Sequence, residues 1–157
     1  MLQYICLADQ NRGDTLKISI KYFNTLPEDS RDIRMKVFVD EQGFEEEFDT
    51  QDNSAVHFLA YSEDNTAIGT CRIFEAESEG EYYLGRLAVL REFRGKNVGT
   101  HLLSAAEEYI RSKNGLAVRL HSQLQAKQFY EKCGYIAFGE IDFEEDCPHI
   151  WMKKFLK

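Results

Sequence analysis

The pattern of apolar residues changes from that of a strand to that of a helix near the middle of the chain. Residues 81–90, EYYLGRLAVL, are typical of a strand. From residue 98 onward the apolar residues recur at helical spacing until KNG at 113–115 ends the helix; they are Val98, Leu102, Leu103, Ala106, Tyr109 and Ile110. A strand that leads into a helix and then into a further strand implies an α/β fold with at least one crossover connection.

The other segments belong to the same fold class. Strands are expected at 16–23, 55–62, 67–76, 116–122, 135–141 and 149–156. A helix is expected over 26–42, because a proline and acidic residues open it and Ile33, Val37 and Phe38 form an apolar stripe. A shorter helix over 125–134 ends at Gly134. The sequence contains no repeat and no linker, so residues 1–157 are predicted to form one mixed α/β domain.

Composition and charge exclude several classes of protein. No apolar run approaches the roughly 20 residues of a membrane span, and the first residues do not resemble a secretory signal, so we expect a cytoplasmic protein without a membrane partner. The formal net charge of -8 argues against general nucleic-acid binding. The four cysteines form no CxxC pair and the four histidines lack metal-ligand spacing, so reduced structural thiols and no metal site are expected.

A short basic stretch follows the strand at 81–90. Residues 90–101, LREFRGKNVGTH, place Arg94 and Lys96 beside two glycines at the start of the next helix. Backbone N–H groups at a helix start point outward and carry partial positive charge, while Gly95 and Gly99 let a ligand approach closely. The stretch is neither a Walker loop nor a Rossmann fingerprint. It therefore predicts a phosphate or pyrophosphate site, and the alternative is a plain turn with solvated basic residues.

This stretch closely resembles the cofactor-binding motif of the GCN5-related N-acetyltransferase (GNAT) family. That motif follows the pattern Q/R-x-x-G-x-G/A; Arg94, Asn97 and Gly99 occupy its positions, so Asn97 stands where a glycine is usual. Asparagine tolerates a left-handed backbone better than other non-glycine residues. The resemblance implies that the loop holds the pyrophosphate of acetyl-CoA and that the strand end pairs with its pantetheine arm. The residues implied are Leu87, Ala88, Val89, Arg94, Gly95, Lys96, Asn97, Val98, Gly99 and Thr100.

A second match lies downstream, in HSQLQAKQFYEKCGY. It resembles the family pattern N-x-x-A-x-x-x-Y-x-x-x-G-F/Y, with Gln123 in place of the usual asparagine. The resemblance places Gln123, Ala126 and Tyr130 at the cofactor, and gives Tyr130 the role of general acid toward the leaving thiolate. A phenol with a pKa of about 10 can donate a proton to such a thiolate. The alternative is that Tyr130 only packs its helix on the sheet.

The family also implies the fold in more detail. We expect a central mixed, mostly antiparallel sheet with splayed middle strands, flanked by helices. Three shorter segments resemble the ElaA-like branch of small bacterial acetyltransferases: RMKVFVDEQGF, FDTQDNSAVHFLAY and GEIDFEEDCPHIWMKK.

An acetyl acceptor amine must lose a proton, so a base is required. Glu41 and His149 are the leading candidates, and His121 and Asp142 are further ones. Each has a structural alternative, a solvated acid or a packed histidine. Two more histidines, His57 and His101, are expected to be structural or surface residues, and Trp151 is expected in the core.

The predicted function is acetyl-CoA-dependent N-acetyltransfer to a small-molecule or peptide primary amine. Two acidic runs, 40–52 and 140–146, favour a cationic acceptor, since their field would concentrate cations; the alternative is that both runs only solubilise the surface. Other functions remain open: a non-catalytic acyl-CoA-binding sensor, and an enzyme like the acyl-homoserine lactone synthases, which share an early R-x-x-V-F segment. Homodimers are common in the family, so a second copy is one expected partner.

Overall fold

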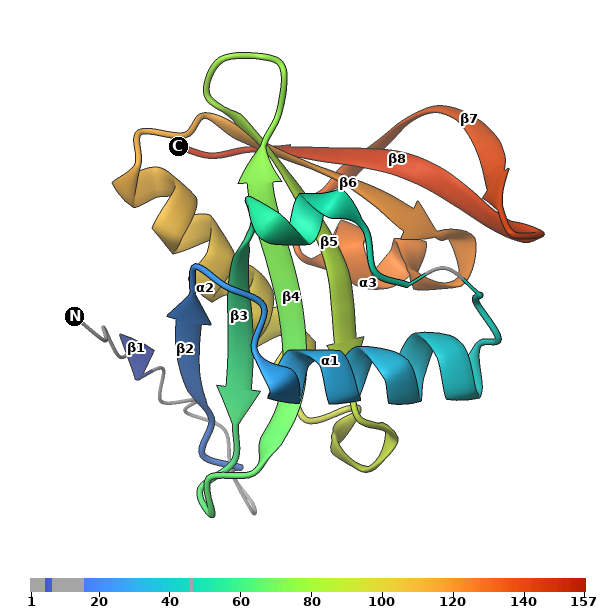
Figure 1. Ribbon diagram of the computed structural model, residues 1–157. Coiled ribbons are helices and arrows are strands. Elements are labelled where there is room, and N and C mark those ends of the chain that lie inside the picture. The colour runs from blue at the N-terminus through green and yellow to red at the C-terminus, as the bar shows by residue number, and fades with distance from the viewer. Residues whose placement is uncertain (1–4, 7–15, 46) are drawn as a thin grey trace. The chain divides into compact units, whose positions relative to one another are not determined.

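The computed structural model describes residues 5–6, 16–45 and 47–157 (Figure 1). The chain divides into two compact units. The first comprises Met1–Phe74 with Arg86–Ala106, and the second comprises Glu75–Gly85 with Glu107–Lys157. Strand β5 (Glu81–Val89) and helix α2 (Val98–Ser112) each run from one unit into the other. No helix in the described part of the chain is long and apolar enough to cross a membrane.

The first unit contains an antiparallel sheet. Its strands pair in chain order; they are β1 (Ile5–Cys6), β2 (Ser19–Phe23), β3 (Val56–Tyr61) and β4 (Ala67–Glu75). Ile20 lies opposite Ala60, and Phe58 lies opposite Cys71. β3 and β4 are buried along most of their length because helices cover both faces, which explains their continuous apolar runs. The strands predicted within 16–23, 55–62 and 67–76 are confirmed.

Helices of the first unit pack on opposite faces of this sheet (Figure 1). On one face, Ile33 and Val37 form a core cluster with Leu59, Tyr61 and Ala88. On the other face, Gly69 of β4 meets the first turns of α2. A Cβ atom at Gly69 would lie 3.0 Å from Val98 Cγ1 and 3.1 Å from Leu102 Cδ1, so only glycine lets the helix approach this closely.

The helix predicted over 26–42 forms, but it changes type halfway. Its first part is α-helix α1 (Glu28–Arg34), and its second part, η1 (Met35–Glu41), is a π-helix. The amide of Gln42 donates to the carbonyl of Val37 at 3.2 Å, the i to i−5 bond of that geometry. Val37 stays buried in this wider helix, and Glu41 becomes its last residue. Apolar spacing alone could not distinguish the two helix types.

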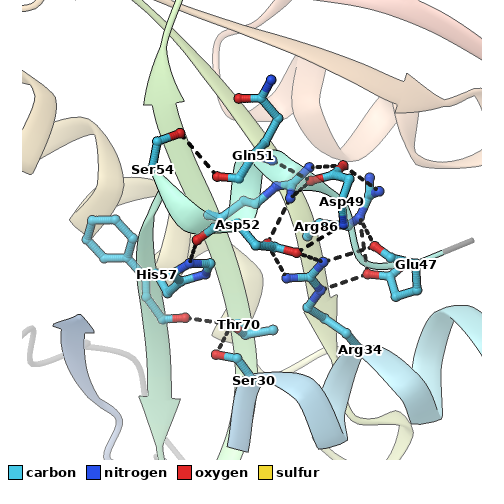
Figure 2. Close-up of polar contacts among 12 residues, drawn as sticks. Ser30, Arg34, Glu47, Asp49, Gln51, Asp52, Ser54, His57, Thr70 and Arg86 are labelled. Atoms are coloured by element: carbon cyan, nitrogen blue, oxygen red, sulfur yellow. Dashed lines mark hydrogen bonds and ion pairs between the residues drawn. The ribbon is translucent and has the colours of Figure 1, made fainter. Parts of the chain in front are cut away.

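A network of arginines and carboxylates holds the segment 47–52 against the sheet (Figure 2). We refer to it as the arginine–carboxylate network; its members are Arg34, Arg72, Arg86, Glu47, Asp49 and Asp52. Arg34 is 1% exposed, and its Nε donates to Glu47 Oε1 at 2.7 Å while its Nη1 donates to Asp52 Oδ1 at 2.8 Å. The three arginines and three carboxylates balance one another, which a buried charge requires.

The two other arginines bind the same carboxylates. Arg72 Nη1 donates to Asp49 at 2.6 Å and to Asp52 at 2.8 Å, and Arg86 Nε lies 3.1 Å from Glu47 Oε1. Burial acts to raise the pKa of Asp52, but hydrogen bonds from Arg34 and Arg72 hold that pKa well below its usual range. The bond from Arg72 likewise lowers the pKa of Asp49, whereas burial raises the pKa of Glu47 against the opposing charge of Arg86.

Two further polar contacts anchor the segment and α1. His57 is buried, and its Nε2 donates to the backbone carbonyl of Asp52 at 3.0 Å, so this histidine is structural, as expected. Ser30 of α1 lies 2.8 Å from Thr70 Oγ1, and Thr70 donates to the carbonyl of Phe58 at 2.8 Å. These bonds fix α1 to β4 and β3.

The second unit contains a mixed sheet. β5 pairs in parallel with β6 (Ala117–Gln123), β6 pairs antiparallel with β8 (Cys147–Phe155), and β8 pairs antiparallel with β7 (Ile136–Glu144). The parallel register covers only Glu81–Tyr83 and Ala117–Arg119, although β6 continues to Gln123. The predicted mixed α/β fold is confirmed.

The last turns of α2 and the short helix α3 (Lys127–Lys132) complete this unit. The hydroxyl of Tyr135 donates to Glu107 Oε1 of α2 at 2.9 Å, and Lys154 Nζ of β8 donates to Glu107 Oε2 at 2.8 Å. Met152 and Leu120 lie opposite each other on β8 and β6, and both are buried. Polar contacts of Glu107 thus attach the last turns of α2, and the apolar face of β6 and β8 forms the core of the second unit.

Substitution Asp52→Asn tests the arginine–carboxylate network. It removes a negative charge that compensates the buried guanidinium groups of Arg34 and Arg72. We therefore expect the free energy of unfolding at neutral pH to fall by about 3–5 kcal/mol, measured by urea titration. Asp40→Asn is the matched control, because Asp40 is exposed at the end of η1, and it should leave stability nearly unchanged.

The same variant tests the pH dependence of stability. The pKa values of Asp49 and Asp52 are lowered in the folded protein, so their contribution is fully present above the unfolded value of about 3.9 and is lost as the pH falls below it. The raised pKa of Glu47 acts in the opposite direction. Asp52→Asn should flatten the wild-type loss of stability below about pH 4; an unchanged slope would show that the network does not control acid unfolding.

Candidate functional site

The basic stretch lies between β5 and α2 in the first unit. A 3-10 turn, η3 (Arg91–Phe93), follows the strand, and a turn from Arg94 to Asn97 leads into α2 at Val98. The amide of His101 donates to the carbonyl of Asn97 at 3.0 Å, which is the first bond of the helix. The amides of residues 98–100 therefore precede the helical hydrogen-bond ladder and are available to an anion.

Two residues of the turn adopt a left-handed backbone. Gly95 has φ of 74° and Asn97 has φ of 63°. Asn97 thus takes the conformation for which the family pattern uses glycine, and asparagine tolerates it. A Cβ atom at Gly95 would meet no atom within 4 Å, so the space beside this residue is open. The turn presents backbone to an open surface, as a site for a phosphate group requires.

The end of β5 is held in place by the arginine–carboxylate network. Arg86 has φ of 53° within the strand, an uncommon conformation for a non-glycine residue. Its side chain contacts Glu47 Oε1 at 3.1 Å and Asp49 Oδ2 at 3.4 Å, and these contacts offset the strain. Leu87, Ala88 and Val89 follow directly; these are the residues expected to pair with a pantetheine arm. Sequence reasoning did not find Arg86, because no local signal marks a left-handed arginine in a strand.

Arg94 and Glu41, predicted to have different roles, contact each other. Arg94 Nη2 lies 3.0 Å from Glu41 Oε2, and Arg91 Nη2 lies 3.5 Å from the same oxygen. Arg94 Nε also donates to the backbone carbonyl of Val89 at 2.9 Å. Two arginines therefore occupy the Glu41 carboxylate in this arrangement.

The acidic run 40–52 does not form the negative surface that its composition suggested. Glu47, Asp49 and Asp52 face the arginines of the network, and Glu41 faces Arg94 and Arg91. Glu46 lies outside the described residues. Arginines distant in the sequence therefore neutralise most of this run. The expectation that these four carboxylates attract a cationic acceptor is wrong, because each already has an arginine partner.

The second matched segment lies in the second unit, after β6. Gln123 ends the strand, a 3-10 turn η4 (Leu124–Ala126) follows, and α3 carries Tyr130. Tyr130 is 9% exposed, and its ring lies 5.1 Å from that of Phe129 and 5.9 Å from that of Tyr135. These contacts fix the ring position, so the packing role and the predicted acid role are compatible.

His149 and Gln123 are direct cross-strand neighbours on β8 and β6. His149 is 4% exposed, and its Nδ1 lies 2.8 Å from the carbonyl oxygen of Cys147. A carbonyl only accepts, so Nδ1 carries the proton and Nε2 has the free lone pair in the neutral ring. Glu144 Oε2 lies 3.7 Å from Nε2. His149 thus has the orientation and the partner of a proton acceptor.

His121 has a different environment from His149. Its Nδ1 lies 2.8 Å from Glu144 Oε1 and its Nε2 lies 2.6 Å from Asp142 Oδ1. A carboxylate therefore engages each ring nitrogen of His121. The ring stacks on Trp151 at 4.6 Å with an interplanar angle of 19°. Trp151 is half-buried and supports this cluster, so its expected place in the core is wrong.

Cys147, two residues before His149, and the buried Cys71 of β4 are poor nucleophiles. Burial raises the pKa of Cys147, and the Glu144 carboxylate raises it further. Burial also raises the pKa of Cys71. Both thiols stay protonated at neutral pH, which argues against an acetylated cysteine intermediate.

Over residues 5–6, 16–45 and 47–157, no group of three or more histidine, cysteine, aspartate or glutamate side chains is arranged to hold a metal ion.

The sequence matches the model of the family described as acetyltransferase (GNAT) domain over residues 27–156. A protein of Bacillus subtilis strain 168 that bears a provisional acetyltransferase name is 35% identical over 128 residues, which cover 78% of this chain and 85% of that protein.

Two crystal structures have the same fold. One, provisionally named an N-acetyltransferase, is from Lactobacillus plantarum; it has a TM-score of 0.81 and 28% identity and covers 89% of this chain and 99% of its own. The other is Escherichia coli ElaA, with a TM-score of 0.74 and 27% identity, covering 88% of this chain and 99% of its own.

Proposed function

The chain belongs to the GNAT acetyltransferase family and is an N-acetyltransferase, and we propose that it transfers the acetyl group of acetyl-CoA to a primary amine by direct attack in a ternary complex. Family members use acetyl-CoA or another acyl-CoA. We further propose that the two units form one catalytic domain; the family match spans residues of both.

The loop at the start of α2 is the observation that carries this proposal. It combines amides that precede the helical ladder, a left-handed turn with open space at Gly95, and the exposed basic side chains Arg94 and Lys96. These donors match a pyrophosphate in charge and in hydrogen-bonding capacity. In this proposal the residues from Arg94 to Thr100 hold the pyrophosphate, the backbone of 87–89 pairs with the pantetheine arm, and Gln123 and Ala126 lie along the cofactor.

Proton transfer at the reacting groups is assigned to Tyr130 and His149. The amine nitrogen forms a bond to the thioester carbonyl carbon and the carbon–sulfur bond breaks; Tyr130 gives its proton to the departing thiolate. His149 takes the proton of the attacking amine at Nε2, with Glu144 stabilising the imidazolium. The neutral tautomer enforced by the Cys147 carbonyl supports this choice over Glu41, whose carboxylate is occupied by two arginines.

Coenzyme A binding and thiol release test the central proposal. Coenzyme A at about 100 times its Kd should stabilise the folded protein by about 2.7 kcal/mol, measured as a rise in Tm. Gly99→Glu should abolish this rise by repulsion, Gly99→Gln should retain part of it, and Asn97→Gly should retain all of it. An undiminished Tm rise in folded Gly99→Glu would remove the loop assignment.

A second assay measures the free thiol released from acetyl-CoA in the presence of a panel of amines. Thiol release with at least one amine indicates an enzyme, whereas binding without release indicates a sensor.

Tyr130→Phe tests the general acid. Turnover should fall by about 10²–10³-fold while coenzyme A affinity stays within a factor of two of wild type. Tyr135→Phe is the matched control, because it removes the hydroxyl that donates to Glu107 at 2.9 Å and should lower stability with little effect on kcat. If Tyr130→Phe turns over at the wild-type rate, another group protonates the thiolate.

The charge of the acceptor is inferred from the hairpin between β7 and β8. Its acidic residues are all exposed; they are Glu140, Asp142, Glu144, Glu145 and Asp146. Asp142 and Glu144 flank the His121 ring beside Trp151 and next to His149. Residues 139–146 carry five carboxylates and no basic side chain, so their summed field attracts a cationic amine. We therefore propose a cationic primary amine as acceptor, now on the basis of this second acidic group alone.

The double variant Asp142→Asn/Glu144→Gln tests the acceptor charge. KM for a polyamine should rise by about 5- to 20-fold, and the wild-type KM should rise with salt because screening shortens the field to about 8 Å at physiological ionic strength. The control Glu140→Gln/Asp146→Asn removes the same charge from the same hairpin and should have a smaller effect. A wild-type preference for neutral or anionic amines would contradict the proposal.

A further inference from the structure

Arg94 is occupied on two sides by groups of its own unit. Its Nη2 contacts both carboxylate oxygens of Glu41, at 3.1 and 3.0 Å, and its Nε donates to the carbonyl of Val89 at 2.9 Å. Arg91 adds a second guanidinium 3.5 Å from Glu41. Glu41 therefore takes the place that an anionic ligand would take at this arginine, and Arg94 covers a carbonyl at the end of β5.

The position of Glu41 makes this contact easy to exchange. Glu41 ends the π-helix η1, and the chain then turns at Gly43, whose φ is 75° and whose Cβ position is open. Its side chain is 22% exposed and that of Arg94 is 42% exposed. Solvent-exposed ion pairs contribute little net stability, so a multiply charged ligand can replace the carboxylate at small cost.

We propose that Glu41 competes with the pyrophosphate of the acyl-CoA substrate for Arg94, so that substrate binding exchanges one ion pair for another and frees the Glu41 carboxylate. This inference rests on the proposed acyl-CoA site. Glu41 lowers the affinity of that site and makes binding depend on the charge of one side chain at the end of η1. The same exchange makes the Val89 carbonyl available when Arg94 turns to the pyrophosphate.

Glu41→Gln tests the exchange by removing the competing charge with little change in shape. Titration calorimetry with coenzyme A should show a dissociation constant about 3- to 10-fold lower than that of wild type. Glu92→Gln is the matched control, because Glu92 is an exposed acid of η3 in the same loop. It removes one negative charge nearby and should change the dissociation constant by less than twofold.

A crystal structure with coenzyme A provides a second readout. Arg94 should contact the pyrophosphate, and its contact with Glu41 should be broken. If Glu41→Gln binds coenzyme A no more tightly than wild type, the exchange is overturned and Glu41 instead supports the loop. The proposed function would still stand in that case, provided that the wild-type protein binds coenzyme A. Equal gains in Glu41→Gln and Glu92→Gln would also overturn it, since they would reflect net charge alone. Absence of coenzyme A binding in every variant would overturn both proposals.

Discussion

The burial of Arg34 is the constraint on which the rest of the first unit depends. A guanidinium that is 1% exposed needs partners, and the chain supplies them from the segment 47–52. Those carboxylates in turn bind Arg72 of β4 and Arg86 of β5, so one network joins α1, the segment 47–52 and two strands. Removing one member leaves a buried charge uncompensated, which costs more than the intact network contributes.

The arginine–carboxylate network also fixes the backbone of β5 beside the proposed acyl-CoA site. Arg86 holds a left-handed conformation directly before the strand end that is proposed to pair with acyl-CoA, and Glu47 and Asp49 hold Arg86. The ion pair of Arg94 with Glu41 differs in that it is partly exposed, and so it can change partner. Buried pairs thus maintain the shape of the site, and an exposed pair is suited to respond to a ligand.

In the second unit, His121 and His149 have different hydrogen-bonding environments. His149 faces a backbone carbonyl at Nδ1 and keeps a lone pair at Nε2, whereas both nitrogens of His121 face carboxylates. The difference arises because β6, β8 and β7 bring Gln123, His149 and Asp142 into register.

The sequence by itself determined the fold class, the order of strands and helices, and the loop from Arg94 to Thr100, because local periodicity, glycines and helix-start chemistry act between residues close in the chain. It also marked Asn97 and Tyr130 through a family pattern. Only the tertiary structure decided which charges are paired. The acids of 40–52 appeared free because their partners, Arg34, Arg72, Arg86 and Arg94, are distant in the sequence and meet them only after strands and helices pack. The left-handed Arg86, the π-helical η1 and the different hydrogen-bond partners of His121 and His149 likewise depend on contacts that no local pattern encodes.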